Sequence, residues 1–220
     1  MAAEALGTAL LLSVVVGSGI MAQRLAGGND AVALLGNTVS TGAALVVLIW
    51  IFGPISGAHF NPAVTVVMAW KRILSWRLAV AYAAAQVIGA VVGVLAAHVM
   101  FATSVVQLST KARDGAGQAV SEVIASFGLL LTILMVGRFR HGSTAIAVGL
   151  YITSAYWFTA STSFANPAVT IARSLSDSFA GIAPDSVPMF IAAQFLGAGL
   201  ALAVCTWFFD AEPGTSMGNG

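Results

Sequence analysis

Apolar residues run along the chain in long stretches that short polar segments separate. A helix that crosses a membrane needs about 20 mostly apolar residues. Six stretches reach this length, and they cover about 3–23, 33–54, 77–101, 119–137, 143–161 and 188–209. The pattern therefore predicts an all-α membrane protein with six transmembrane helices.

Two further apolar segments, 59–70 and 166–174, are too short to cross a membrane. At 1.5 Å per residue, each reaches only about halfway through a hydrocarbon core of roughly 30 Å. We expect each segment to be a re-entrant half-helix, and the two half-helices together to form one composite span.

The chain also contains an internal repeat, 3–101 and 119–209. Each copy has a helix that begins with a glutamate, then a plain helix, a half-helix, and a helix that carries Gln-x-x-Gly. Three full spans per copy is an odd number, so the second copy must insert in the opposite orientation. We therefore expect a single domain, 1–220, that is built as an inverted repeat.

Composition agrees with a membrane protein. Hydrophobic residues make up 59% of the chain and charged residues only 8%, whereas soluble domains carry about a quarter. The net charge of +1 gives no basic field for nucleic acid. The expected partner is thus the lipid bilayer. No grouping of residues resembles a catalytic triad, a metal cluster or a phosphate loop, so we expect no enzyme, no metal and no cofactor.

The basic residues predict an orientation. The short loops of one side carry Lys71, Arg72, Arg77, Arg138 and Arg140. The opposite side carries Arg24, Lys111, Arg113 and Arg173. By the excess of cytoplasmic Lys and Arg, the first side is expected to face the cytoplasm, together with both termini. The tail from 212 to 220 has the composition of a disordered end.

Each half-helix starts with the same motif, Asn61-Pro62-Ala63 and Asn166-Pro167-Ala168, followed by Val-Thr. Asn is a preferred N-cap, and Pro suits the next position because the N–H that it lacks would have no partner. Capping uses the Asn oxygen, so we expect the side-chain NH₂ to be free for a passing solute. Two electropositive helix starts that meet at mid-membrane would orient a water or alcohol oxygen and repel cations.

The residues before each Asn are predicted to be non-helical at membrane depth, where lipid cannot satisfy their carbonyl groups. We therefore expect their backbone to line a water-filled path. The positions concerned are Gly57, Ala58 and His59 in the first copy, and Ser161 and Thr162 in the second.

The chain resembles the aquaporin and aquaglyceroporin family, the major intrinsic proteins. The matching features are the sequence Ser-Gly-Ala-His-Phe-Asn-Pro-Ala-Val-Thr at 56–65, the two Glu-x-x-x-Thr/Ser helix starts, and the repeated Gln-x-x-Gly. The resemblance implies one pore per protomer, a homotetramer, and passive movement of water or small neutral solutes. It also implies that Glu4 and Glu122 support the loops that enter the half-helices.

Family channels narrow at four positions, which here become Thr41, Ser154, Ser163 and Val169 by counting from the motifs. Water-selective members usually place Phe, His, a small residue and Arg there, and glycerol channels usually place Trp, a small residue, Phe and Arg. Val169 stands in place of the Arg. The expected aperture is wider, uncharged and partly hydroxylated.

Such an aperture favours small neutral polyhydroxy compounds. Glycerol is one, and arsenous acid is another. The chain resembles bacterial channels without this Arg that are associated with arsenite and methylarsenicals, which points to a bacterial inner membrane. The alternatives are an ordinary water-selective or glycerol-selective channel and a non-conducting structural membrane protein.

Arg173 lies one helical turn beyond Val169. We expect it to be a surface residue paired with Asp177. The alternative is that it hangs over the outer vestibule and partly replaces the missing charge.

Overall fold

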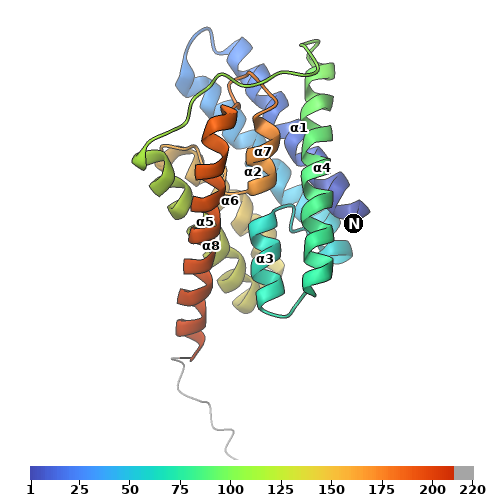
Figure 1. Ribbon diagram of the computed structural model, residues 1–220, viewed down its shortest axis with the longest axis vertical. Helices are drawn as coiled ribbons and strands as arrows, with labels where there is room; N and C mark the ends of the chain where they lie inside the picture. The colour runs from blue at the N-terminus through green and yellow to red at the C-terminus, as the bar shows by residue number, and fades with distance from the viewer. Residues whose placement is uncertain (211–220) are drawn as a thin grey trace, which may run out of the picture.

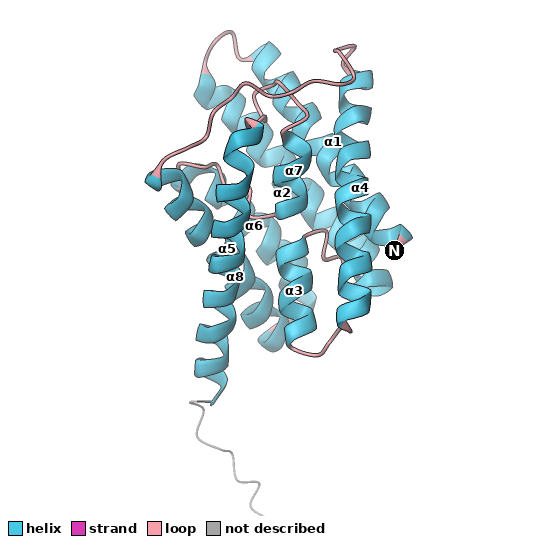
Figure 2. Cartoon of the chain, viewed as in Figure 1, coloured by secondary structure: helices cyan, strands magenta, loops and turns pink. Residues whose placement is uncertain are grey.

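The computed structural model describes residues 1–210, and within that range the only regular secondary structure is helix, joined by loops (Figure 2). The expected tail at 212–220 lies outside the described residues. The elements are α1 (Ala2–Leu25), α2 (Asp30–Ser56), α3 (Pro62–Trp70), α4 (Trp76–Met100), α5 (Ala116–Phe139), η1 (His141–Ser143), α6 (Thr144–Phe158), α7 (Pro167–Arg173), η2 (Pro184–Ser186) and α8 (Val187–Asp210).

The two copies of the repeat pack against each other as equivalent sets. α1 packs along α2 and α4, and its counterpart α5 packs along α6 and α8. α2 and α6 join the copies. Each half-helix also packs on the other copy, because α3 contacts α8 and α7 contacts α4. Figure 1 shows α3 and α7 approaching each other from opposite ends of the bundle. This is the predicted inverted repeat with two re-entrant half-helices.

Among the described residues, five helices are long and apolar enough to cross a membrane. The fifth predicted span, 143–161, is shorter than expected because α6 covers only 15 residues and ends at Phe158. At 1.5 Å per residue this helix is roughly 22 Å long. From Thr159 the chain leaves the helix and turns back towards the second motif.

The half-helices begin at the two motifs, as the capping argument predicted, so α3 is shorter than the apolar segment 59–70. α3 starts at Pro62 and not at 59, because Asn61 adopts an extended backbone (φ −152°) and caps the helix. Asn166 does the same for α7 (φ −157°). In each case Pro occupies the first helical position, as expected for a residue without an N–H.

Glycines allow the spans to pack backbone to backbone. A Cβ on Gly89 of α4 would lie 2.1 Å from the carbonyl oxygen of Ala5 on α1. In the second copy, a Cβ on Gly197 of α8 would lie 2.3 Å from the carbonyl oxygen of Val123 on α5. Since both obstacles are backbone atoms, these two helix pairs require glycine at the crossing.

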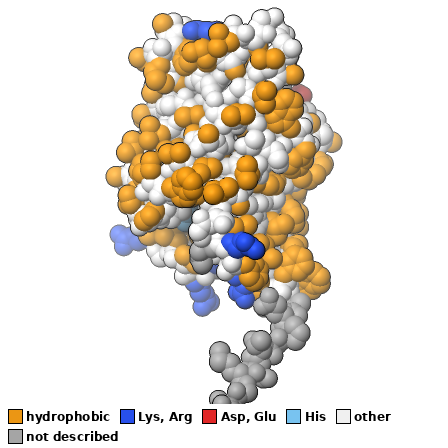
Figure 3. All heavy atoms as spheres, turned by 180° about the vertical axis from the view of Figure 1, so that it is seen from behind, with side chains coloured by type: hydrophobic (Ala, Val, Ile, Leu, Met, Phe, Trp, Pro, Cys, Tyr) orange, Lys and Arg blue, Asp and Glu red, His pale blue; other side chains and the backbone are white. Residues whose placement is uncertain are grey.

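The surface has the character expected in a bilayer. Apolar side chains cover most of the face in Figure 3, and most of the visible Lys and Arg side chains lie at its lower end. At that end Lys71 and Arg138 converge on the ring of Phe209, at 5.8 Å and 4.2 Å from its centroid. These basic residues come from different copies of the repeat and gather on one side, as the sequence predicted.

Candidate functional site

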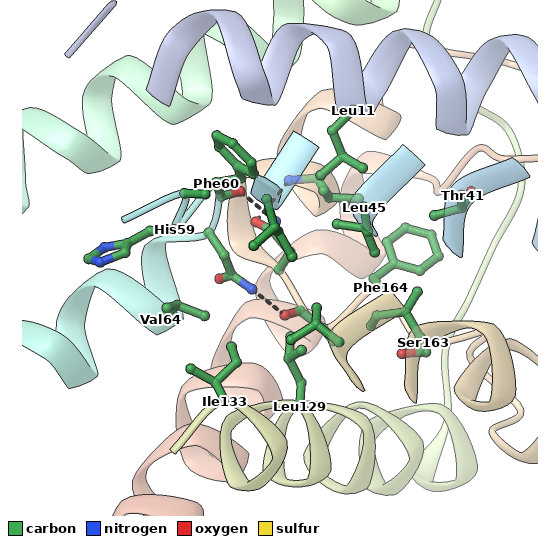
Figure 4. A pocket seen from close by; sticks show the side chains of 18 of the residues that line it. Leu11, Thr41, Leu45, His59, Phe60, Val64, Leu129, Ile133, Ser163 and Phe164 are labelled. Carbon is green, nitrogen blue, oxygen red and sulfur yellow. Dashed lines mark hydrogen bonds between the residues drawn. The ribbon is translucent and has the colours of Figure 1, made fainter. Parts of the chain in front are cut away.

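A cavity of about 280 Å³ lies between the two copies of the repeat (Figure 4). It is lined on one side of the motifs by residues such as Met68, Ile133 and Thr144, and on the other side by Thr41 and Arg173. The cavity therefore extends past both half-helix starts. The end beside Arg173 is called here the arginine mouth; it is lined by Thr41, Tyr156, Ser163, Phe164, Val169 and Arg173.

At the centre, the two motifs hold each other. Asn61 donates from Nδ2 to the carbonyl oxygen of Ala165 (2.7 Å), and Asn166 donates from Nδ2 to the carbonyl oxygen of Phe60 (2.8 Å) (Figure 4). Their Oδ1 atoms cap the half-helices by accepting from the N–H of Ala63 and Ala168. The expectation that both amide protons are free is therefore wrong, because one proton of each amide joins the two loops. The second proton remains for a solute.

A buried carboxylate stands behind each loop. Glu4 accepts from the N–H of His59 (3.1 Å) and Phe60 (2.8 Å), and from Nε2 of Gln86 (2.8 Å). Its counterpart Glu122 accepts in the same way from the three donors in the second copy: the N–H of Phe164 (2.9 Å), the N–H of Ala165 (2.9 Å) and Nε2 of Gln194 (2.6 Å). Both carboxylates are fully buried, and each is matched by several donors, as a charge at membrane depth requires.

These carboxylates hold the loops in an unusual backbone conformation. Non-glycine residues with positive φ are Ala58 (48°) and Phe60 (48°) in the first loop, and Thr162 (59°), Ser163 (49°) and Ala165 (49°) in the second. Each costs about 1–3 kcal/mol and persists only where surrounding contacts determine it. The hydrogen bonds to Glu4 and Glu122 supply such contacts.

The two predicted stretches of lining backbone differ. Gly57, Ala58 and His59 lie on the cavity. The ring of His59 accepts or donates one hydrogen bond with Thr65 Oγ1 (3.1 Å), and Figure 4 shows it turned away from the centre of the cavity. Ser161 and Thr162 are not among the lining residues. This prediction is wrong because Arg113 Nη1 reaches the Ser161 carbonyl (3.1 Å) and covers it.

Three of the four predicted filter residues line the arginine mouth, namely Thr41, Ser163 and Val169. Ser154 does not. It is exposed, and its Oγ donates to the carbonyl oxygen of Tyr151 (3.2 Å). The α6 residues on the cavity are Val148, Ile152 and Tyr156, which are spaced by four and share one helix face.

The geometry of a helix explains this correction. Ser154 lies two residues from Ile152 and from Tyr156, about 200° around the helix from each. Tyr156 occupies the mouth instead, and its hydroxyl donates to Thr41 Oγ1 at 3.4 Å. Counting from the motif placed the residue on the wrong face because the count alone does not fix where α6 ends.

Ser163 has an unpaired polar atom on the cavity. Its side chain is only 3% exposed, and its Oγ has no hydrogen-bond partner among the described residues. A buried hydroxyl without a partner is costly. Although the residue lines the cavity, this Oγ has almost no exposed surface in the structure.

Arg173 is buried at the arginine mouth, and the expected surface pair with Asp177 does not form. Asp177 instead accepts from the N–H of Thr110 at 2.8 Å. The Arg173 guanidinium stacks on the ring of Phe164, with Cζ 3.4 Å from the centroid, and its Nε donates to the carbonyl oxygen of Ala180. Arginine burial was missed because the carbonyl groups that receive it belong to a loop whose path is set by tertiary structure.

The segment 101–115 crosses this mouth and brings a second arginine. Arg113 donates from Nε to the carbonyl oxygen of Gly181 (2.9 Å), and its Cζ lies 4.9 Å from the centroid of Phe164. The segment is fixed over α7 by hydrogen bonds from Ser109 N to the Ser174 carbonyl oxygen (2.9 Å) and from Ala183 N to the Lys111 carbonyl oxygen (2.7 Å).

The pKa of Lys111 is sensitive to the positive charge gathered at this mouth. Burial, and then repulsion from Arg113 and Arg173, lowers the pKa of its amine to about 8. Because only the neutral amine is nucleophilic, we expect its acylation by an amine reagent to reach half its maximal rate near pH 8. Replacing Arg113 with Gln removes one repelling charge and should raise this midpoint. Mass spectrometry of the labelled protein over a pH series measures both midpoints, and an unchanged value in the variant would contradict the assignment.

Comparison with known proteins places this geometry in a family. Residues 1–143 match the major intrinsic protein family. Aquaglyceroporin AqpS of Rhizobium meliloti (strain 1021) is 55% identical over 208 residues, which are 94% of this chain and 89% of that protein. Glycerol uptake facilitator protein-like 6 of Lactiplantibacillus plantarum is 30% identical over 221 residues, which are 96% of this chain and 97% of that protein.

A solved structure agrees in fold. The X-ray structure of the aquaglyceroporin from Plasmodium falciparum is similar with a TM-score of 0.70 at 21% identity, covering 96% of this chain and 94% of that one. The expectation of an integral membrane channel protein, and of no enzyme, is confirmed by these relatives. The chain thus has the aquaporin fold and belongs to the major intrinsic protein family.

Proposed function

We propose that the protein is a passive channel for small uncharged solutes with a wide filter that lacks arginine at position 169. One observation carries this proposal. The cavity passes both Asn motifs and reaches the arginine mouth, which Thr41, Tyr156, Ser163 and Val169 line together with Phe164 and Arg173. Among the described residues, no carboxylate lines the cavity. A neutral hydrogen-bonding solute suits this environment.

The proposed solutes are glycerol-like polyols and arsenous acid, together with water. Each carries hydroxyl groups that can bond to Tyr156 and to the remaining amide protons of Asn61 and Asn166. The names of the relatives, an aquaglyceroporin and a glycerol uptake facilitator, support the polyol. Arsenous acid is supported by its neutral trihydroxide form and by the width of an opening with Val169 in place of Arg.

The proposed setting is a bacterial inner membrane, with one single-domain channel per chain, the arginine mouth outside and both termini in the cytoplasm. The basic residues gathered at the opposite end support this orientation. We also propose a homotetramer. Large apolar side chains such as Trp50, Leu150 and Trp157 are exposed on α2 and α6, and these faces are available to lipid or to neighbouring subunits.

A pair of matched variants tests the proposal. Purified protein in liposomes, with no ion gradient, should conduct glycerol, arsenous acid and water by stopped-flow light scattering. Thr41→Phe, which adds bulk at the mouth, should lower glycerol flux about tenfold, equivalent to about 1.4 kcal/mol of barrier. Ser154→Phe adds the same bulk to the exposed face of α6 and should leave flux within about twofold.

Three results would overturn it. Absence of solute flux in the wild-type protein would favour a structural membrane protein. A requirement for a sodium or proton gradient would favour a coupled transporter. Equal effects of the two substitutions would mean that the mouth described here is not the narrow point.

A further inference from the structure

We propose that Arg173, supported by Arg113, sets the charge selectivity of the channel from a position one helical turn away from Val169. This inference rests on the proposed channel function. It assigns to these two residues the exclusion of protons and metal cations, and it leaves the size of the opening to Thr41, Tyr156, Ser163 and Val169.

Arg173 has the placement that this role requires. Its side chain is 2% exposed, yet it lines the cavity at the arginine mouth. Among the described residues, the only hydrogen bond of its guanidinium runs from Nε to the Ala180 carbonyl oxygen. The two Nη groups have no hydrogen-bond partner among the described residues, and they are not fully enclosed. Four N–H donors of a fixed cation are therefore available to the cavity.

Arg113 strengthens the same field from the crossing segment. It is 8% exposed and is anchored by the carbonyl groups of Gly181 and Ser161. Both guanidinium groups lie against the ring of Phe164, with Arg173 at 3.4 Å and Arg113 at 4.9 Å from its centroid. Cation–π contacts of this kind hold two like charges near one another. The ring itself is fixed edge-on against Phe190, with centroids 5.1 Å apart.

Neither arginine is directly paired with an acidic group, although the buried Glu122 attracts both guanidinium groups electrostatically. Among residues 1–210, neither guanidinium has a carboxylate as a hydrogen-bond partner. The nearest buried carboxylate on this side, Glu122, is already occupied by Phe164, Ala165 and Gln194. Lys111 adds further positive charge over Phe179, with Nζ 4.7 Å from the ring centroid. A cation that enters this mouth therefore meets two guanidinium charges that no direct ion pair neutralises.

The consequence is a separation of two functions. An arginine at 169 would both repel cations and narrow the opening. Here the charge is displaced by four residues along α7, so a broad neutral solute can pass while a small cation is still repelled. The stack on Phe164 and the bond to Ala180 keep the guanidinium at the wall.

The test measures proton flux and glycerol flux in the same liposomes, using a trapped pH dye under a potassium diffusion potential and stopped-flow scattering. Arg173→Gln should raise proton flux about tenfold and retain glycerol flux. Arg173→Lys keeps the charge and should stay near the wild-type value. Adding Val169→Arg to Arg173→Gln should restore low proton flux, because it returns the charge at the neighbouring turn.

Arg24 provides the matched control. It also stacks on a ring, with Cζ 5.3 Å from the centroid of Phe101, and donates to a carbonyl oxygen, but it does not line this cavity. Arg24→Gln should leave proton flux unchanged. If Arg173→Gln does not fold, Arg113→Gln decides, with an expected rise of about threefold.

An Arg173→Gln channel that conducts glycerol with the proton flux of the wild type would overturn this inference and leave the proposed channel intact. If the wild-type protein conducts no glycerol, the proposed function itself is overturned. A proton flux that rises equally in Arg24→Gln would show a general effect of removing positive charge, and would also contradict the role of Arg173.

Discussion

Replacing Val169 with arginine is expected to lower glycerol and arsenous acid flux about tenfold while water flux stays within about twofold. Val169 is buried and lines the arginine mouth together with Thr41 and Ser163. An arginine there would extend across the opening and fill the space that a polyol needs. A single file of water requires less width and can donate to or accept from the remaining polar atoms.

The substitution also places two like charges four residues apart, at 169 and 173. Such pairs destabilise a helix by about 0.2–0.5 kcal/mol, which is small beside the expected change in flux. Stopped-flow measurements on reconstituted protein give the ratio of glycerol to water permeability. Val169→Leu is the control, because it adds apolar volume without a charged side chain, and it should reduce glycerol flux much less. If the ratio in Val169→Arg equals that of the wild type, the width of the filter does not depend on this position.

The second large effect concerns folding. Gly197→Ala should prevent formation of the folded channel, because the new Cβ would lie 2.3 Å from the Val123 carbonyl oxygen and 3.0 Å from Phe127 N. Both are backbone atoms of α5, so the helices must separate. Overpacking of this kind costs roughly 1–3 kcal/mol and more where backbone must move.

Gly199→Ala is the matched control on the same helix, since a Cβ there meets nothing within 4 Å. Alanine has the better helix propensity by about 1 kcal/mol, so this variant should be as stable as the wild type or slightly more stable. The yield of monodisperse protein in detergent and its thermal unfolding temperature measure both variants. Equal behaviour of the two would show that the contact between α5 and α8 can relax.

The family, the inverted repeat and the two half-helices could be predicted from the sequence. The doubled motif encodes its own local structure, because Asn caps a helix and Pro begins one wherever they stand. The long apolar stretches encode spans through length alone. Such features depend on residues close in sequence, and the structure keeps them with small changes of boundary at Asn61 and Phe158.

The predictions that failed depend on contacts between distant segments. Ser154 was assigned by a fixed count, but the face of α6 on the cavity depends on how that helix packs against α2. Arg173 reads as a surface residue by its charge, and its burial depends on the Ala180 carbonyl and the Phe164 ring. The spacing of Asn166, Val169 and Arg173 does fit one helix face, and this is the signal that could have placed it on the cavity.

The reciprocal bonds between Asn61 and Ala165 and between Asn166 and Phe60 have a consequence for how such a channel can be regulated. Neither half-helix can withdraw without breaking a hydrogen bond on the other copy, in a place where no lipid group can replace it. The contact between the two half-helices at mid-membrane is therefore rigid, and it can form only after both copies of the repeat have inserted. Any device that opens or closes the passage must act at one of its ends, where the crossing segment and the short loops are free to differ.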